Sequence, residues 1–316
     1  MSNGSIKTKI FFHIGYPKTA TIFLQKNLFS KHREVNFFCR RYSKNDDQIF
    51  SIIDEIILLD NDEFLSRKMI LQNLFKNINF DKSKINLISD QNILCHKFRE
   101  NNDMYRTLDR INQIFKKDDI ELKLFFSVRA QEEAILSIYR QFYFSYFSKE
   151  LPSLNGIFNP NTKKEINEIL ESLKYFNTYN FLKKKFGENN IKIFSYELLK
   201  LNRNKFFLEI CNYLNINPSI ISVIQNSSYE NKFSYKKVSL INSIIYNIKN
   251  YKNLIRYLPT KIVSFFNFLL FDYIQGKIRL IKLARTKFNS QNKKKILEFY
   301  KEDNLKLQSE IKINLL

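Results

Sequence analysis

Short apolar runs alternate with longer segments of helical periodicity through most of the chain, and this alternation restricts the folds that it can adopt. A short run of Ile, Phe, Leu and Val indicates a buried strand, whereas apolar residues three or four positions apart indicate a helix. Strands are predicted near residues 9–14, 35–38, 84–89, 121–128 and 190–195, and helices near 20–31, 47–59, 62–77, 103–117, 131–147, 165–186 and 203–214. The pattern predicts an α/β fold of three layers, in which helices cover both faces of a central parallel sheet.

Chain length and composition indicate how this fold is divided. The 316 residues can bury one sizeable core and a smaller appendage, and a hydrophobic content of 44% is that of a globular chain. With 5 Gly and 5 Pro in the sequence, no glycine-rich linker separates its parts. We predict an α/β core over residues 1–230 and a basic helical extension over residues 231–316 that packs on it.

Three cysteines and the first residues indicate the compartment. Cys39, Cys95 and Cys211 are widely spaced and form no C-x-x-C pair. They therefore argue for a reducing compartment and against a disulfide framework or a zinc site. The polar segment Met1–Thr8 and the short apolar run after it lack the features of a secretory signal. A cytoplasmic protein without a metal site is expected.

The segment 10–25 carries the first motif that points to chemistry. A buried run, Ile10–Ile14, leads into a loop with Gly15, Lys18, Thr19 and Thr21, and a helical pattern follows. At such a helix start, free N–H groups and the helix dipole favour an anion. The lysine adds a positive charge and the threonines add hydroxyl donors. The segment predicts a phosphate-like group near Lys18; the alternative is an ordinary strand–turn–helix unit with a solvated lysine.

A second motif lies at the end of the predicted strand 121–128. Arg129 closes this strand, and Ser137 lies eight positions later on the next predicted helix. A guanidinium offers a planar fork of donors that matches phosphate oxygens, and a serine two turns into the helix can reach the same phosphate. Alone, the two residues are equally explained by a capping arginine and a surface serine.

Together the two motifs resemble the sulfotransferase family. The loop lacks the nucleotide-triphosphate pattern G-x-x-x-x-G-K-[ST] and is similar to the family's 5′-phosphosulfate loop, Pro-Lys-Thr-Gly-Thr-Thr. The string 128–141 resembles the matching segment of bacterial carbohydrate-type members. The resemblance implies a P-loop-like core and the sulfuryl donor PAPS (3′-phosphoadenosine 5′-phosphosulfate), with PAP as the product.

The resemblance also implies which residues hold the donor. Lys18 would grip the phosphosulfate together with Thr19, Ala20, Thr21 and Ile22, of which Ile22 contributes by its backbone. Arg129 and Ser137 would bind the 3′-phosphate.

Two positions depart from the family's pattern. Ala20 replaces the usual glycine, and it suits helical dihedral angles but is strained at positive φ. Ile22 replaces the last threonine and so removes one hydroxyl donor.

Sulfuryl transfer requires charge compensation at the leaving phosphate and a base for the acceptor. Lys18 is predicted to supply the charge. In relatives a Glu or His beyond the central strands is the base, and here the expected glutamate position aligns with Gln91, which cannot act as one. Asp90 and His96 are the candidates. Asp90 is equally explained as the cap of a helix that begins near Gln91, and His96 as a surface histidine.

Positive charge concentrates near the C-terminus. From Asn231 to Lys295 there are fifteen Lys or Arg and one acid, Asp272, which accounts for +14 of the net +21. The apolar segment Ile262–Ile274 is too short to span a bilayer and is either a core helix or an interfacial one. Such a region can attract an anionic glycan or an anionic membrane surface, and solvated helix faces are the plain alternative. Nucleic acid is not favoured as a partner.

Two short segments extend the resemblance. Asp303 and Asn304 resemble the acidic residue–Asn–x–x–Leu helix that ends many bacterial sulfotransferases, and Asn231–Lys237 is a candidate loop over the 3′-phosphate or adenine. The prediction is therefore a PAPS-dependent sulfotransferase whose acceptor is a carbohydrate or glycolipid hydroxyl, cytoplasmic or peripheral at the inner membrane. Two alternatives stay open: a P-loop nucleoside or sugar kinase, and a non-catalytic basic binding protein of the same fold.

Overall fold

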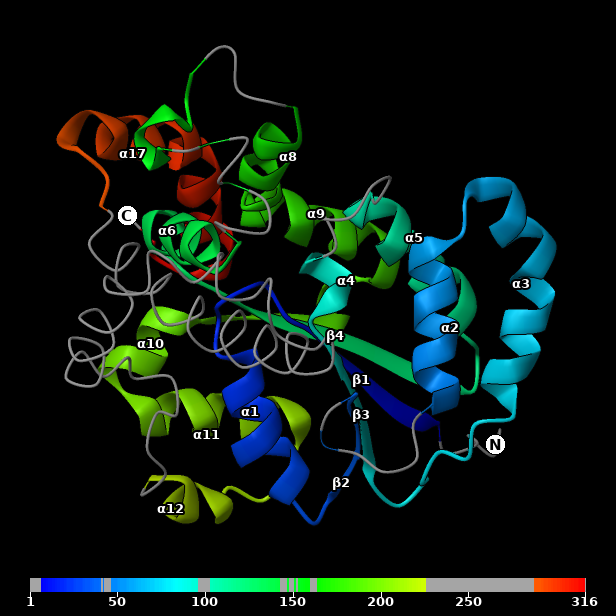
Figure 1. Ribbon diagram of the computed structural model, residues 1–316. Helices are drawn as coiled ribbons and strands as arrows, with labels where there is room; N and C mark the ends of the chain where they lie inside the picture. The colour runs from blue at the N-terminus through cyan, green and yellow to red at the C-terminus, as the bar shows by residue number, and fades with distance from the viewer. Residues whose placement is uncertain are drawn as a thin grey trace, which may run out of the picture.

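In the part of the chain that the structure describes, five parallel strands form a central sheet (Figure 1). The computed structural model describes residues 7–40, 42, 47–95, 103–142, 147, 151, 153–159, 164–225 and 287–315. The strands are β1 (Thr8–Ile14), β2 (Val35–Phe38), β3 (Ile85–Asp90), β4 (Ile120–Val128) and β5 (Ile191–Ser195), and their spatial order is β2-β3-β1-β4-β5.

Strand β1 is the middle strand and contributes to both faces of the sheet. Its residue Ile10 aligns with Asn86 of β3 on one side and with Leu122 of β4 on the other. Side chains alternate between the faces, so Phe12 belongs to one apolar cluster and Phe11 to a second, and both are buried. A strand buried on both faces needs an apolar side chain at nearly every position, as the run 10–14 provides.

Helices cover both faces of the sheet (Figure 1). The larger cluster is covered by α2 (Asp47–Leu58), α3 (Asn61–Lys76), α4 (Asn92–Cys95), α5 (Met104–Phe115), α6 (Gln131–Phe142), α8 (Lys164–Ser172), α9 (Tyr175–Phe186) and α17 (Ser290–Lys306). The smaller cluster is covered by α1 (Thr21–Asn27), α10 (Tyr196–Leu201), α11 (Arg203–Leu214) and α12 (Ile220–Gln225). The predicted three-layer, P-loop-like α/β fold is confirmed.

One predicted helix is wrong. The segment 165–186 forms two helices, α8 and α9, with a turn at Leu173 and Lys174. The carboxylate of Asp303 accepts hydrogen bonds from the backbone N–H groups of Phe176 and Asn177. These N–H groups belong to the first turn of α9, where an outside acceptor replaces the missing intrahelical one. A residue 127 positions further along therefore fixes this helix start.

The described C-terminal residues pack on the core. Helix α17 lies against α6 and α9, and the π-turn Leu307–Ile311 continues it. The predictions for the basic region, including the loop Asn231–Lys237 and the segment Ile262–Ile274, lie outside the described residues. The domain boundary at 230/231 stays a prediction. Within the described ranges, no helix is both long and apolar enough to cross a membrane.

Candidate functional site

The loop between β1 and α1, residues 15–20 and here called the Lys18 loop, lies at the carboxyl edge of the sheet. From β1 the chain proceeds to β2 and β3 on one side, and it crosses to β4 and β5 on the other. In open α/β sheets, ligands bind at the carboxyl ends of the strands where the strand order reverses in this way. The end of β4, with Arg129, is the neighbouring part of this edge.

Two residues of the Lys18 loop have left-handed backbone conformations. Lys18 has a φ of 67°, and Ala20, which immediately precedes helix α1, has a φ of 68°. Residues with a side chain adopt this region at a cost of about 1–2 kcal/mol, whereas glycine adopts it without that cost. Of the two conformations considered for Ala20, helical and positive φ, the structure thus has the strained one with positive φ. Strain of this kind gathers at ligand sites, where the surrounding structure maintains it.

Gly15 and the two threonines determine how the loop closes. A Cβ on Gly15 would overlap the Thr21 hydroxyl group, so any larger residue there would require Thr21 to move. The Thr19 hydroxyl donates to the Tyr16 carbonyl at 2.8 Å, so its hydrogen is already used in the loop, and donor binding by Thr19 stays a prediction. The buried Thr21 hydroxyl has no hydrogen-bond partner among the described residues. Of the two hydroxyl groups, that of Thr21 is the one left without a partner in the described part of the chain.

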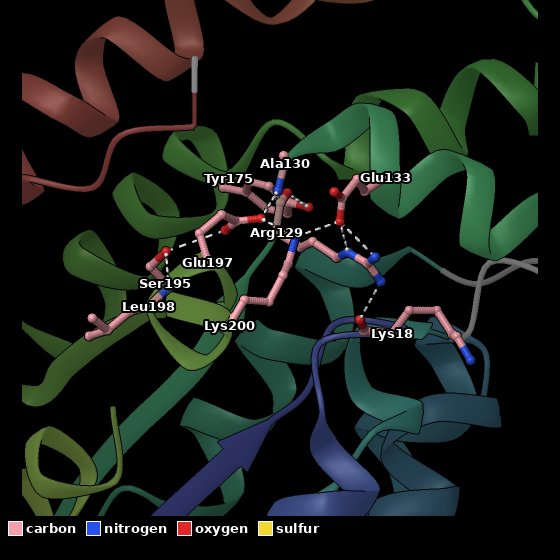
Figure 2. A network of polar contacts seen from close by, with 9 residues as sticks. All are labelled: Lys18, Arg129, Ala130, Glu133, Tyr175, Ser195, Glu197, Leu198 and Lys200. Atoms are coloured by element: carbon pink, nitrogen blue, oxygen red, sulfur yellow. Dashed lines mark hydrogen bonds and ion pairs between the residues drawn. The ribbon is translucent and has the colours of Figure 1, made fainter. Parts of the chain in front are cut away.

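Arg129 lies beside the Lys18 loop. Its Nη1 donates to the Lys18 carbonyl at 3.3 Å, although the two residues are 111 positions apart. The Lys18 side chain extends away from the guanidinium (Figure 2). The Tyr175 hydroxyl donates to the Arg129 carbonyl at 2.9 Å, and the Glu197 carboxylate accepts from the Ala130 N–H at 2.9 Å. The turn that carries Arg129 is therefore held from two other elements, α9 and α10.

The structure joins the two predicted motifs but adds residues that the sequence analysis missed. Glu133 accepts two hydrogen bonds from Arg129, and Lys200 of α10 contacts the same carboxylate. Ser137 is half-buried and follows Glu133 by four positions, so the two share a face of α6. The contact between Arg129 and Glu133 could have been found from the sequence, because the two residues are four positions apart. No sequence pattern relates Lys200 to either of them.

Asp90 lies at the end of β3 and is buried. Its Oδ2 accepts from Arg40 Nε at 2.9 Å and its Oδ1 from the Asn92 N–H at 2.8 Å. Burial raises the pKa of Asp90 despite the opposing effect of Arg40. The contact with Asn92 caps α4, as one of the two interpretations of this residue predicted, and the role of Asp90 as a base stays a prediction.

His13 is the histidine of strand β1, two residues before the Lys18 loop. His13 is buried on β1, its Nδ1 lies 2.8 Å from the Ser89 hydroxyl, and its ring stacks on Phe125. Burial lowers the pKa of His13 to about 3, so the ring is neutral. His13 is therefore a structural, hydrogen-bonded residue of the strand. His96, the other candidate base, lies outside the described residues.

Comparisons with known proteins find similarity in structure alone. No family model matches the sequence, and no curated protein matches it. Among solved structures, a sulfotransferase from Alicyclobacillus acidocaldarius has a TM-score of 0.41 and 13% identity, over 74% of this chain and 90% of that chain. Mouse SULT7A1 complexed with PAP has a TM-score of 0.36 and 14% identity, over 75% of each chain.

A third structure, the sulfotransferase domain of the Synechococcus PCC 7002 olefin synthase, has a TM-score of 0.38 and 9% identity, over 77% of this chain and 96% of that chain. Because the three TM-scores lie below 0.5, the fold is defined by the strand order and register above, and the function is inferred from the site.

Proposed function

We propose that the protein is a sulfotransferase that uses PAPS. The observation that carries the proposal is the position of Arg129, whose guanidinium touches the backbone of Lys18 while the two cationic groups point in different directions. A nucleotide with phosphate groups at the 3′ and 5′ positions of its ribose needs two separate cationic sites, and both must lie at the same edge of the sheet. The two motifs supply them, since each offers the charge and the donors that a phosphate requires.

The residues of the Lys18 loop fit a phosphosulfate group. Lys18 would bind its oxygens as a point charge, and the backbone of Thr19, Ala20, Thr21 and Ile22 would offer N–H donors at the start of α1. The uncommitted hydroxyl of Thr21 is the kind of buried group that a ligand oxygen satisfies. Arg129 and Ser137 would hold the 3′-phosphate.

PAPS, when bound, would supply the sulfuryl group that is transferred to an acceptor hydroxyl, with PAP released. The part of Lys18 would be to stabilise the charge that develops on the leaving phosphate. A base would remove the proton of the acceptor, and Asp90 and His96 are the proposed candidates. Burial raises the pKa of Asp90, which favours proton uptake, but Arg40 must release the carboxylate first.

The acceptor that we propose is a hydroxyl of a surface polysaccharide or glycolipid. Its support is the similarity of segment 128–141 to carbohydrate-type members and the net charge of +21, which suits an anionic acceptor or membrane surface. The protein would act in the cytoplasm, where it could also associate with the inner membrane.

Calorimetric titration of the full chain tests donor binding. We expect binding of adenosine 3′,5′-bisphosphate and weaker binding of ATP with Mg²⁺. Lys18→Met should weaken bisphosphate binding at least tenfold, whereas Lys205→Met, an exposed lysine on α11, should not change it. Preference for ATP with Mg²⁺ would instead indicate a kinase.

Transfer of labelled sulfate tests the acceptor. The protein is incubated with labelled PAPS and with candidate glycans, glycolipids and a small phenol. Label in glycans supports the proposal, and label in the phenol alone contradicts the acceptor class. Bisphosphate binding without any transfer would favour a non-catalytic binding protein.

A further inference from the structure

Three donor nitrogens from two cations converge on a single carboxylate oxygen beside the Lys18 loop. Oε2 of Glu133 accepts from Arg129 Nε at 3.0 Å, from Arg129 Nη2 at 2.7 Å and from Lys200 Nζ at 2.7 Å (Figure 2). The two cations come from different elements, the end of β4 and helix α10. We call Arg129, Glu133 and Lys200 the Glu133 cluster.

The ring of Tyr196 supports both cations of the Glu133 cluster. The Arg129 guanidinium lies 4.7 Å from the centre of this ring, and the Lys200 ammonium lies 5.4 Å from it. The negative face of an aromatic ring attracts each cation without using its hydrogen-bond donors. The positions of Arg129 and Lys200 therefore do not depend on Glu133 alone.

The cluster is accessible to a ligand. The side chains of Glu133 and Lys200 are 45% and 39% exposed, and that of Arg129 is 18% exposed. The pair of Glu133 with Lys200 is exposed, and exposed ion pairs contribute little to folding stability, because water solvates the separated charges well. Glu133 can therefore leave its partners at low cost when a stronger anion arrives.

We propose that the carboxylate of Glu133 occupies the place of a phosphate group and that Lys200 is a further phosphate-binding residue of the donor site. This inference rests on the proposed function. A forked guanidinium together with an ammonium is the donor set that a phosphomonoester uses. A phosphomonoester carries nearly two negative charges at neutral pH and a carboxylate carries one, so the phosphate displaces Glu133 and takes both cations.

Displacement of Glu133 by a phosphate predicts opposite effects of substitutions at Glu133 and at Lys200. Glu133→Gln removes the competing charge and should strengthen binding of adenosine 3′,5′-bisphosphate about threefold to tenfold. Lys200→Met removes one donor and should weaken it about tenfold. Adenosine 5′-monophosphate lacks the second phosphate, so both substitutions should leave its binding unchanged.

Calorimetric titration of the full chain with both nucleotides measures these effects. Glu132→Gln is the matched control for the acid, since Glu132 lies on the same helix and its carboxylate contacts Lys293 at 2.8 Å. Lys205→Met is the control for the lysine. Neither control should change the affinity for either nucleotide.

Several outcomes would overturn the inference. If Glu133→Gln weakens bisphosphate binding, Glu133 positions Arg129 and does not compete with the ligand. If Lys200→Met weakens both nucleotides equally, or neither, Lys200 does not bind the second phosphate. If the unmodified protein binds the bisphosphate but no variant differs from it, only this inference fails, whereas absence of bisphosphate binding removes the proposed function as well.

Discussion

Ala20 shows how a single backbone angle relates stability to a site. Its φ of 68° costs an L-residue about 1–2 kcal/mol, and glycine would avoid that cost. Glycine also loses about 0.4–1 kcal/mol through the greater freedom of the unfolded chain. We therefore expect Ala20→Gly to raise the free energy of unfolding by up to about 1.5 kcal/mol, measured by urea denaturation.

Ala134 is the matched control for this substitution. It is a buried alanine inside α6, where glycine should lower the free energy of unfolding by about 1 kcal/mol. A loss of stability at position 20 as large as that at position 134 would contradict the conformation described for the Lys18 loop.

His13 makes the stability of the protein depend on pH. Burial lowers its pKa from 6.5 to about 3. Between these values the unfolded chain binds the proton and the folded one does not, so stability falls as pH decreases through this window. The contribution of this residue should fall by about 2 kcal/mol between pH 7 and pH 5, at about 1.4 kcal/mol per pH unit.

His13→Gln separates this effect from those of other groups. The variant should lose less stability than the unmodified protein when urea denaturation is repeated at pH 7 and at pH 5. Equal losses for the two proteins would show that His13 does not titrate on unfolding in this range.

Residues near the site differ in how far the sequence predicts them. Lys18 and Arg129 were predicted because Arg129 directly follows one buried run and Lys18 lies in the short loop after another, and parallel strands bring such ends to one edge of the sheet. Lys200 could not be predicted, because it reaches Glu133 across 67 residues from a separate helix. The commitment of the Thr19 hydroxyl to Tyr16 was missed, because it depends on the exact closure of the loop.

At the level of elements, α17 is tied to the start of α6 by a pair of buried amides. Gln131 Nε2 donates to Asn304 Oδ1 at 2.8 Å, and Asn304 Nδ2 donates to Gln131 Oε1 at 3.1 Å. The same helix carries Asp303, which caps α9. Gln131 is two residues from Arg129, and Tyr175 of α9 holds the Arg129 carbonyl. Helix α17 therefore supports the turn of Arg129 from two directions.

The amide pair gives a prediction at this level. Asn304→Ala leaves the Gln131 amide buried without this partner and should lower the free energy of unfolding by about 1–3 kcal/mol. Gln131→Ala combined with Asn304→Ala should cost less than the sum of the two single substitutions, by about 0.5–3 kcal/mol. Leu305→Ala, at an exposed neighbouring position, should stay within about 0.5 kcal/mol of the unmodified protein. If the losses in free energy of unfolding from Gln131→Ala and Asn304→Ala were additive, the two amides would not interact as described.

Strands were predicted more accurately than helices. Each of the five predicted strands lies within a residue or two of its observed bounds, because a strand buried on both faces is a nearly unbroken apolar run. Helix ends depend on single hydrogen bonds that can come from distant residues. The division between α8 and α9 depends on Asp303, and local periodicity over 165–186 does not contain that information.

At the scale of the whole molecule, the described C-terminal residues belong to the main core. Their buried apolar side chains join the same cluster as Phe12 of the central strand, and they are Phe288, Ile296, Tyr300, Leu307, Ile313 and Leu315. The core of the fold thus includes residues from both ends of the sequence. A chain assembled in this way should unfold as one cooperative unit.

Removal of residues 287–316 tests whether the chain unfolds as one cooperative unit. Each fully buried apolar side chain contributes about 1.5–3 kcal/mol, so six of them amount to as much as the usual net stability of a domain, about 5–15 kcal/mol. We therefore expect the shortened chain to lose its cooperative thermal transition, followed by circular dichroism. A variant of the full chain with Leu297→Gln and Leu305→Gln is the control, because both side chains are about half exposed on α17 and their replacement should leave the transition in place. If the shortened chain unfolds with the same midpoint as the full chain, α17 is an attachment to a core that is complete without it.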